Sequence, residues 1–161
     1  DDQGRWAAGG AVIQDLLSDM LAEPFFAKQP PKSTGRDLFN WPWLEQHLAG
    51  RSGLAPQDVQ TTLTELTALA CANSIRSAMP ACETLIVCGG GSLNDSLMAR
   101  LQVALPGVAV ASSTSWGLPS LQVEATAFAW LARQTVLRKT GSVQSVTGAK
   151  GARILGAIYP A

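Results

Sequence analysis

Two short apolar segments on either side of a helical segment constrain the fold of this chain more than any other feature. Residues 84–88 (TLIVC) and residues 108–111 (VAVA) predict buried β-strands, because they are short, apolar and partly β-branched. Residues 94–105 between them predict a helix, with Asn94 or Ser92 available as its N-cap. A connection of about a dozen residues is what a parallel β-α-β unit needs.

The rest of the chain predicts mainly helices and irregular segments. Helices are expected, in chain order, over residues 11–22, 43–49, 56–78 and 122–139. Pro24 ends the first of these helices, and Pro56 suits the first turn of the long third helix. Residues 24–42 are rich in proline and predict a loop, while residues 145–161 predict a loop followed by a short extended segment.

The two predicted strands indicate an incomplete sheet. Two strands are too few for a stable independent sheet, and strands this apolar are typical of sheets that are covered on both faces. The chain also begins at Asp1 without a methionine. We therefore expect a helix-rich α/β protein that is part of a longer chain, whose N-terminal portion holds further strands.

Composition narrows the classes of function. Acidic and basic residues balance at 12 each, which gives no support for a nucleic-acid-binding surface. No apolar run reaches the roughly 18 residues of a membrane span, and no secretion leader opens the chain. Cys71, Cys82 and Cys88 match no metal-site spacing and predict reduced, mostly buried thiols of a cytoplasmic protein. The single histidine, His47, predicts an ordinary helix residue.

Three consecutive glycines, Gly89, Gly90 and Gly91, follow the first predicted strand and precede a helix. A ligand can approach backbone that lacks Cβ atoms, and the helix N-terminus offers free N–H groups to an anion or nucleotide. Ligands of open α/β sheets also bind beyond the carboxyl ends of the strands. The triplet matches neither GxGxxG nor GxxxxGK[ST], and a tight turn with close helix–strand packing explains it equally well.

Two further segments are candidate binding elements. Residues 32–36 (KSTGR) place two cations and two hydroxyl groups around a glycine, which suits a phosphate or an acidic sugar substituent but also an ordinary solvated loop. Glu124 lies near the start of an otherwise apolar helix. It is either an acid favoured by the helix N-terminus or a carboxylate aimed into a cleft, as a general base or as an acceptor for sugar hydroxyls.

Four blocks of the sequence resemble the C-terminal part of the anhydro-N-acetylmuramic acid kinase family. They are, in chain order, PKSTGRDLFNWPWL, VCGGGSLNDSLMARL, VEATAFAWLARQTVLRKTG and SVTGAKGARILGAIYP. The opening DDQGRWAAGG is also similar to a segment of that family. The resemblance implies a ribonuclease-H-like fold of the actin, heat-shock chaperone and sugar kinase superfamily. Residues 1–161 would form the C-terminal part of the second, nucleotide-side domain of a two-domain sugar kinase.

The resemblance also implies an activity and a set of site residues. Members of the family are cytoplasmic enzymes of peptidoglycan recycling. With ATP, Mg²⁺ and a water, they open the 1,6-anhydro ring of anhydro-N-acetylmuramic acid and form N-acetylmuramic acid 6-phosphate. Gly89, Gly90, Gly91 and Asn94 would bind the nucleotide, and Glu124 would bind the sugar or the attacking water. Further loop contacts would come from Lys32, Thr34 and Arg36.

This sequence departs from the family in what it does not contain. The GTSxDGxD phosphate loop and the DxGPGN segment, whose aspartate is the expected general base, do not occur. We therefore expect no metal ligand in this chain and no activity without the missing N-terminal half. Two alternatives are a chaperone-like or regulatory ATP-binding module of the same superfamily, and a non-enzymatic domain whose exposed helices form a homodimer.

Overall fold

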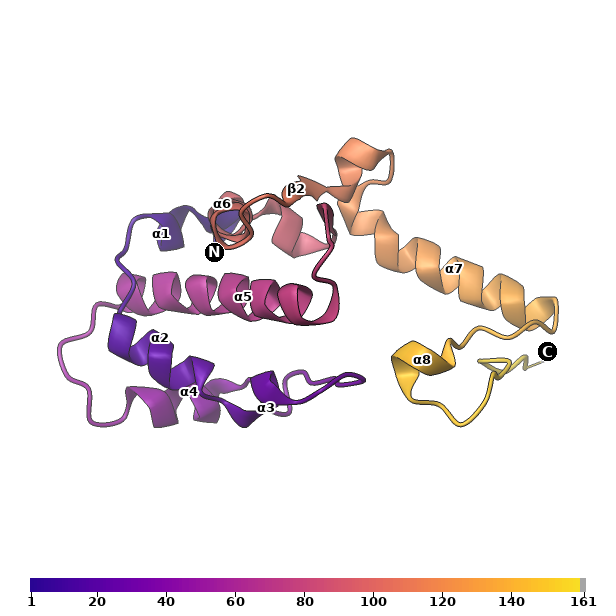
Figure 1. The fold of residues 1–161 in the computed structure, drawn as a ribbon, viewed down its shortest axis with the longest axis horizontal. Coiled ribbons are helices and arrows are strands. Elements are labelled where there is room, and N and C mark those ends of the chain that lie inside the picture. Colours follow the sequence, from indigo (N-terminus) through magenta and orange to yellow (C-terminus); the bar gives the residue numbers. More distant parts are fainter. Residues whose placement is uncertain (160–161) are drawn as a thin grey trace.

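A computed structural model describes residues 1–159 and places the longest helix, α5 (Pro56–Ala78), in the middle of a helical body (Figure 1). On one side of α5 lie α2 (Gln14–Leu21), α3 (Pro24–Ala27) and α4 (Trp41–Leu48). On its other side lie α1 (Arg5–Ala8), α6 (Asp95–Ala104), β1 (Thr84–Val87) and β2 (Ala109–Ser112). The helix α7 (Val123–Val136) runs away from this body, and the chain then turns back from its far end to α8 (Gln144–Thr147).

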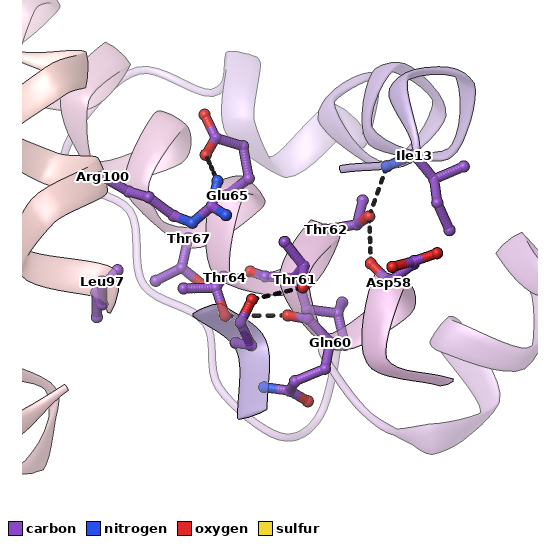
Figure 2. A network of polar contacts seen from close by, with 12 residues as sticks. Ile13, Asp58, Gln60, Thr61, Thr62, Thr64, Glu65, Thr67, Leu97 and Arg100 are labelled. Carbon is purple, nitrogen blue, oxygen red and sulfur yellow. Dashed lines mark hydrogen bonds and ion pairs between the residues drawn. The ribbon is translucent and has the colours of Figure 1, made fainter. Parts of the chain in front are cut away.

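The bounds of α5 match the predicted helix over residues 56–78. Pro56 occupies its first turn, as expected. Threonine hydroxyls in its N-terminal half connect it to the preceding segments (Figure 2). The Thr61 hydroxyl donates to the Ala7 carbonyl at 2.6 Å, and the Thr62 hydroxyl accepts from the Ile13 amide at 2.9 Å. These buried hydroxyls therefore fix the connection between α1 and α2 onto α5.

The apolar core lies between α2, α4 and α5. Leu16, Leu17 and Met20 of α2 are buried against Leu66 of α5, and partly buried side chains of α4 pack around them. Leu16, Leu17 and Met20 share helical spacing on α2, which confirms the amphipathic pattern predicted for residues 11–22, although the helix begins only at Gln14. Burial of one such side chain contributes about 1.5–3 kcal/mol, so this cluster is a main source of stability.

A second interface joins α5 to α6. Glu65 of α5 and Arg100 of α6 form a half-buried ion pair (Figure 2). Ala68 and Ala72 follow Glu65 at helical spacing and are fully buried, so this face of α5 points toward α6. The buried Leu101 lies on the facing helix. Small residues on α5 allow the two helices to approach closely.

The strands β1 and β2 pair in parallel, with Thr84 opposite Ala109 and Val87 opposite Ser112. With α6 between them they confirm the predicted β-α-β unit. The expectation that both faces are covered is wrong within residues 1–159: Ile86 is 44% exposed, and the other strand residues are half-buried or exposed. Residues 1–159 form no further strand, so β1 and β2 pair only with each other there.

Three smaller expectations also differ from the structure. The predicted loop over residues 24–42 contains the one-turn helix α3, whose first amides are capped by Glu23. Residues 145–159, predicted as a loop and an extended segment, also hold the end of the unpredicted helix α8; residues 160–161 lie outside the described part. Cys71 and Cys88 are exposed and Cys82 is only half-buried, because the first two line the uncovered side of the sheet.

The helix α7 begins close to its predicted start, ends three residues early, and has no buried residue in this structure. Phe128 is 63% exposed and Trp130 is 49% exposed, although both are large apolar side chains. The predicted helix over residues 122–139 is therefore present, but its apolar side chains lack a covering surface among residues 1–159. No helix in that part of the chain is long and apolar enough to cross a membrane.

Candidate functional site

The glycine turn that follows β1 is open rather than tightly packed. Gly89 has φ 73° and ψ −167°, a conformation that only glycine adopts readily. A Cβ atom added to Gly89 or Gly90 would meet no other atom within 4 Å, and at Gly91 it would make an ordinary contact with Leu97. Close helix–strand packing therefore does not explain Gly90 and Gly91. Their backbone is free to be approached by a ligand.

The turn also presents unused hydrogen-bond donors. The hydrogen bonds found over residues 1–159 include none from the amides of Gly90 and Gly91, while the Gly89 amide donates to the Ser120 carbonyl at 2.9 Å. A 3₁₀ turn, η2 (Gly90–Leu93), leads from these amides into α6. Two backbone N–H groups at a helix entrance can bind an electron-rich ligand atom.

Asn94 has a structural task at this turn. Its Oδ1 atom accepts from the Leu97 amide at 2.9 Å, which confirms Asn94 as the N-cap of α6. The same side chain fills the space beside Gly4, where a Cβ atom would overlap it. The Asn94 oxygen is therefore committed to the helix, and only its Nδ2 group remains for a ligand.

An open hollow of about 770 Å³ lies beside the glycine turn, lined by residues 1–3 and residues 90–95. Its lining contains three carboxylates and no lysine or arginine. Asp1 accepts from two amides of α1, and Asp2 pairs with Arg5, whereas Asp95 makes no side-chain hydrogen bond with any described residue. A negative lining disfavours phosphate groups and suits the hydroxyls of a neutral nucleoside. No sequence pattern predicted this wall, because about ninety residues separate its two parts.

The structure brings the start of α7 to the glycine turn. A 3₁₀ turn, η4 (Ser120–Gln122), contacts η2 and runs directly into α7. The Ser120 carbonyl accepts the Gly89 amide, and Glu124 lies in the first turn of α7 with an exposed side chain. Glu124 and the glycines therefore belong to one region, at the carboxyl ends of the two parallel strands. Sequence reasoning missed Ser120 as part of this region. The serine- and threonine-rich segment that follows β2 was the only sequence feature that could have indicated it.

The predicted loop residues occupy a different place. Lys32 donates to the Phe26 carbonyl at 2.8 Å, and its ammonium lies 5.2 Å from the centre of the Phe25 ring. It lines an apolar hollow of about 540 Å³ between α5 and β1, distinct from the hollow at the glycine turn. Thr34 is half-buried and Arg36 is exposed, and neither side chain bonds to another described residue. Lys32 thus has a structural role on α3.

The described residues hold no ready-made cluster of metal ligands. Across residues 1–159 no three side chains of His, Cys, Asp or Glu gather closely enough to hold a metal ion. The carboxylates of Asp1 and Asp2 are already bonded to α1 and Arg5.

Comparisons with known proteins give the family. The sequence model of the family described as anhydro-N-acetylmuramic acid kinase matches residues 1–161. Curated proteins of that name from Variovorax paradoxus and Albidiferax ferrireducens are each 60% identical over 161 residues, and one from Pseudomonas paraeruginosa is 49% identical. Each match covers 100% of this chain but only 43%, 41% and 44% of the respective relative. The chain therefore spans less than half the length of these relatives.

Proposed function

The chain belongs to the anhydro-N-acetylmuramic acid kinase family, and we propose that it is the nucleotide-side, C-terminal part of such a kinase. The complete enzyme would use ATP and Mg²⁺ to open the 1,6-anhydro ring of anhydro-N-acetylmuramic acid and phosphorylate the freed 6-oxygen. It would act in the cytoplasm, in peptidoglycan recycling, on a ribonuclease-H-like fold. One observation carries the proposal: the glycine turn after β1 is open and presents unbonded amides.

The charge of the hollow indicates which end of ATP binds there. The triphosphate carries several negative charges, and the lining of the hollow offers carboxylates and no cation. The nucleoside is therefore the part of ATP that suits this hollow, with the glycine amides facing its polar atoms. The phosphates would extend away from Asp1, Asp2 and Asp95 toward groups that other parts of the enzyme supply.

Glu124 supports the sugar side of the same proposal. It is an exposed carboxylate in the first turn of α7, beside the glycine turn and not within the hollow lining. A carboxylate in this place can accept hydrogen bonds from sugar hydroxyls or orient a water. In the structural alternative, the carboxylate only stabilises the N-terminus of α7 and binds no ligand. Kinetics of a Glu124 variant distinguish the two.

Phosphoryl transfer needs more than this chain contains. It depends on positioning of the reactants and on charge stabilisation by metal ions and phosphate-binding donors. The described residues offer neither a metal cluster nor a cation at the hollow. We therefore assign the general base, the phosphate loop and the metal ligands to the remaining part of the longer protein, which would be the essential partner of this segment.

Two variants of the full-length enzyme test the proposal. Gly90→Val adds a side chain in open space, so the protein should fold normally while its affinity for ATP falls tenfold or more by calorimetry, a change of about 1.4 kcal/mol. Glu124→Gln should lower the turnover of the anhydro sugar and leave ATP affinity unchanged. Glu45→Gln, which changes an exposed carboxylate of α4, is the matched control.

The outcomes separate the candidate functions. Equal loss of both ligands in both variants would indicate misfolding rather than a site. ATP hydrolysis by the wild-type enzyme that does not depend on the sugar would favour a chaperone-like or regulatory ATP-binding module. ATP affinity that Gly90→Val leaves unchanged would remove the glycine turn from the nucleotide site.

A further inference from the structure

Two successive hydrogen bonds join the glycine turn to the segment that carries Glu124. The Gly89 amide donates to the Ser120 carbonyl at 2.9 Å, and the Ser120 amide donates to the Thr114 hydroxyl at 3.1 Å. Thr114 belongs to a 3₁₀ turn, η3 (Ser113–Trp116), which directly follows β2. The ends of both parallel strands are therefore linked through one residue, Ser120.

This link is shielded from water at its centre. Ser120 is only 4% exposed, so water cannot easily replace a partner that its amide or carbonyl loses. The loop between the two 3₁₀ turns is also held, because the Leu118 amide donates to the Ser113 carbonyl and the Gly117 amide to the Thr114 carbonyl, both at 3.1 Å. The loop therefore holds Ser120 in a fixed place relative to β2.

Packing does not fix the position of α7 in the same way. The helix has no buried residue over its whole length. Among residues 1–159, the attachment at η4 is therefore the main contact that decides where the first turn of α7 lies. Glu124 is four residues beyond Ser120, within that first turn. A shift of Ser120 would move the Glu124 carboxylate with it.

We propose that Thr114 is a positioning residue, which sets the place of Glu124 relative to the nucleotide bound at the glycine turn. The inference rests on the proposed function. The Thr114 hydroxyl holds the Ser120 amide, the Ser120 carbonyl holds the Gly89 amide, and α7 starts from Ser120. Misplacement of a catalytic or substrate-binding group by about 1 Å can lower a rate on the order of a hundredfold. Thr114 itself contacts neither ligand.

Steady-state kinetics of the full-length enzyme test the role of Thr114. Thr114→Val keeps the shape of the side chain, removes the acceptor and leaves the buried Ser120 amide without a partner. We expect kcat for the anhydro sugar to fall about tenfold or more, with the KM for ATP changed less than about twofold. Thr114→Ser retains the hydroxyl oxygen and should restore kcat to near the wild-type value.

A matched control lies on α7 itself. The Thr126 hydroxyl donates only to the Gln122 carbonyl one turn earlier, at 2.7 Å, and the residue is exposed. Thr126→Val thus makes the same chemical change close to Glu124 without touching the glycine turn, and kcat should stay within about twofold of wild type. Single-turnover rates, normalised to active enzyme, separate a slower reaction from a smaller folded fraction.

The possible results distinguish a failure of the proposed function from a failure of the positioning role of Thr114. A wild-type enzyme that phosphorylates no anhydro sugar overturns the proposed function, and the role of Thr114 with it. An active wild type with unchanged kcat in Thr114→Val overturns the positioning role alone. The role is also overturned if Thr114→Ser is as slow as Thr114→Val, because the acceptor is then present. If Thr114→Val does not fold, Thr114→Ala replaces it with the same expected loss of kcat.

Discussion

The helices around α5 and the helix α7 both carry many apolar side chains, but these side chains are buried in the first region and exposed in the second. Around α5, Leu16 and Met20 are completely buried, and α6 packs on the opposite side over two buried alanines. On α7, which runs away from the helical body (Figure 1), Phe128 is 63% exposed and Trp130 is 49% exposed. In the first region, other residues of this chain bury the apolar side chains; on α7, the described residues do not.

This difference indicates where the rest of the protein belongs. Large exposed apolar side chains on a helix, together with an uncovered sheet face, mark surfaces that normally meet another surface. The chain spans about two fifths of the length of its curated relatives, so most of such a protein lies outside residues 1–161. We expect that remainder to cover β1 and α7 and to leave the core around α5 largely unchanged.

The largest expected effect contrasts one residue from each region. Leu16→Ala in the full-length protein should lower the free energy of unfolding by about 3 kcal/mol, because it leaves a cavity in a fully buried site. Because the remainder is expected to cover α7 through an interface rather than a core, Phe128→Ala should cost less, about 1 kcal/mol. Urea unfolding followed by circular dichroism measures both values. A cost for Phe128→Ala as large as for Leu16→Ala would show that the remainder buries α7 as firmly as the core.

A second contrast uses glycines. A Cβ atom at Gly10 would lie 2.8 Å from the Gln57 carbonyl oxygen and would also overlap the Thr61 hydroxyl. Gly10→Ala should therefore cost about 2 kcal/mol of unfolding free energy through overpacking. Gly90→Ala enters open space and should cost less than about 0.5 kcal/mol. Thermal or urea unfolding checks both, and a tolerated Gly10→Ala would contradict the close contact between α5 and the segment before α2.

Asn94 gives a smaller effect at the border of the helical body. Asn94→Ala removes the N-cap of α6 and should cost about 1 kcal/mol of unfolding free energy. Asn94→Asp keeps an acceptor oxygen and should retain most of that stability. Calorimetric titration with ATP then tests the second role: if the Nδ2 group binds the nucleotide, Asn94→Asp lowers ATP affinity although it folds normally. Wild-type affinity in Asn94→Asp would restrict Asn94 to the cap.

The smallest expected effect concerns pH. The Arg51 guanidinium beside Asp19 lowers the pKa of that carboxyl below its ordinary value of 3.8, chiefly through their hydrogen bond. A carboxyl with a lowered pKa stabilises the fold above its ordinary pKa, and this contribution disappears as the pH falls through the lowered value. Arg51→Gln should thus reduce stability slightly at neutral pH, and the difference from wild type should shrink below about pH 4.

The control for this pH effect is a second arginine. Arg76 bonds to the Asn73 side chain and to the Ala104 carbonyl, and not to a carboxylate. The loss of unfolding free energy in Arg76→Gln should therefore be the same at neutral and at acid pH. Urea unfolding at low salt is the measurement, because exposed ion pairs are screened. A parallel pH dependence in both variants would exclude Asp19 as its source.

The sequence predicted those elements that local signals determine. Pro56 and a long apolar stripe gave α5 its bounds, and the two β-branched apolar segments gave the parallel pair. The one-turn helix α3 was missed because four residues are too few to show a helical period. Pro24 at its first position and the Glu23 cap were local signals of a helix start, but Pro24 was taken only as the end of the preceding helix.

The candidate site likewise has features that the local sequence indicated and features that it did not. The sequence allowed two explanations for the glycines, a tight turn with close packing or an approach path for a ligand, and the free space around Gly89 and Gly90 removes only the close packing. The cap at Asn94 followed from its place before a helix. The opposite wall of the hollow and the bond from Gly89 to Ser120 join residues far apart in the chain. Only the three-dimensional structure could reveal them.

The central place of α5 has a consequence for how the protein opens. Elements pack against it from both sides, so its amide protons can exchange with solvent deuterium only after those layers separate. We expect the amides between Thr61 and Ala72 to exchange most slowly in the chain, at a rate set by global unfolding. The amides of α7 should exchange much earlier, through local fraying that leaves the rest of the molecule intact.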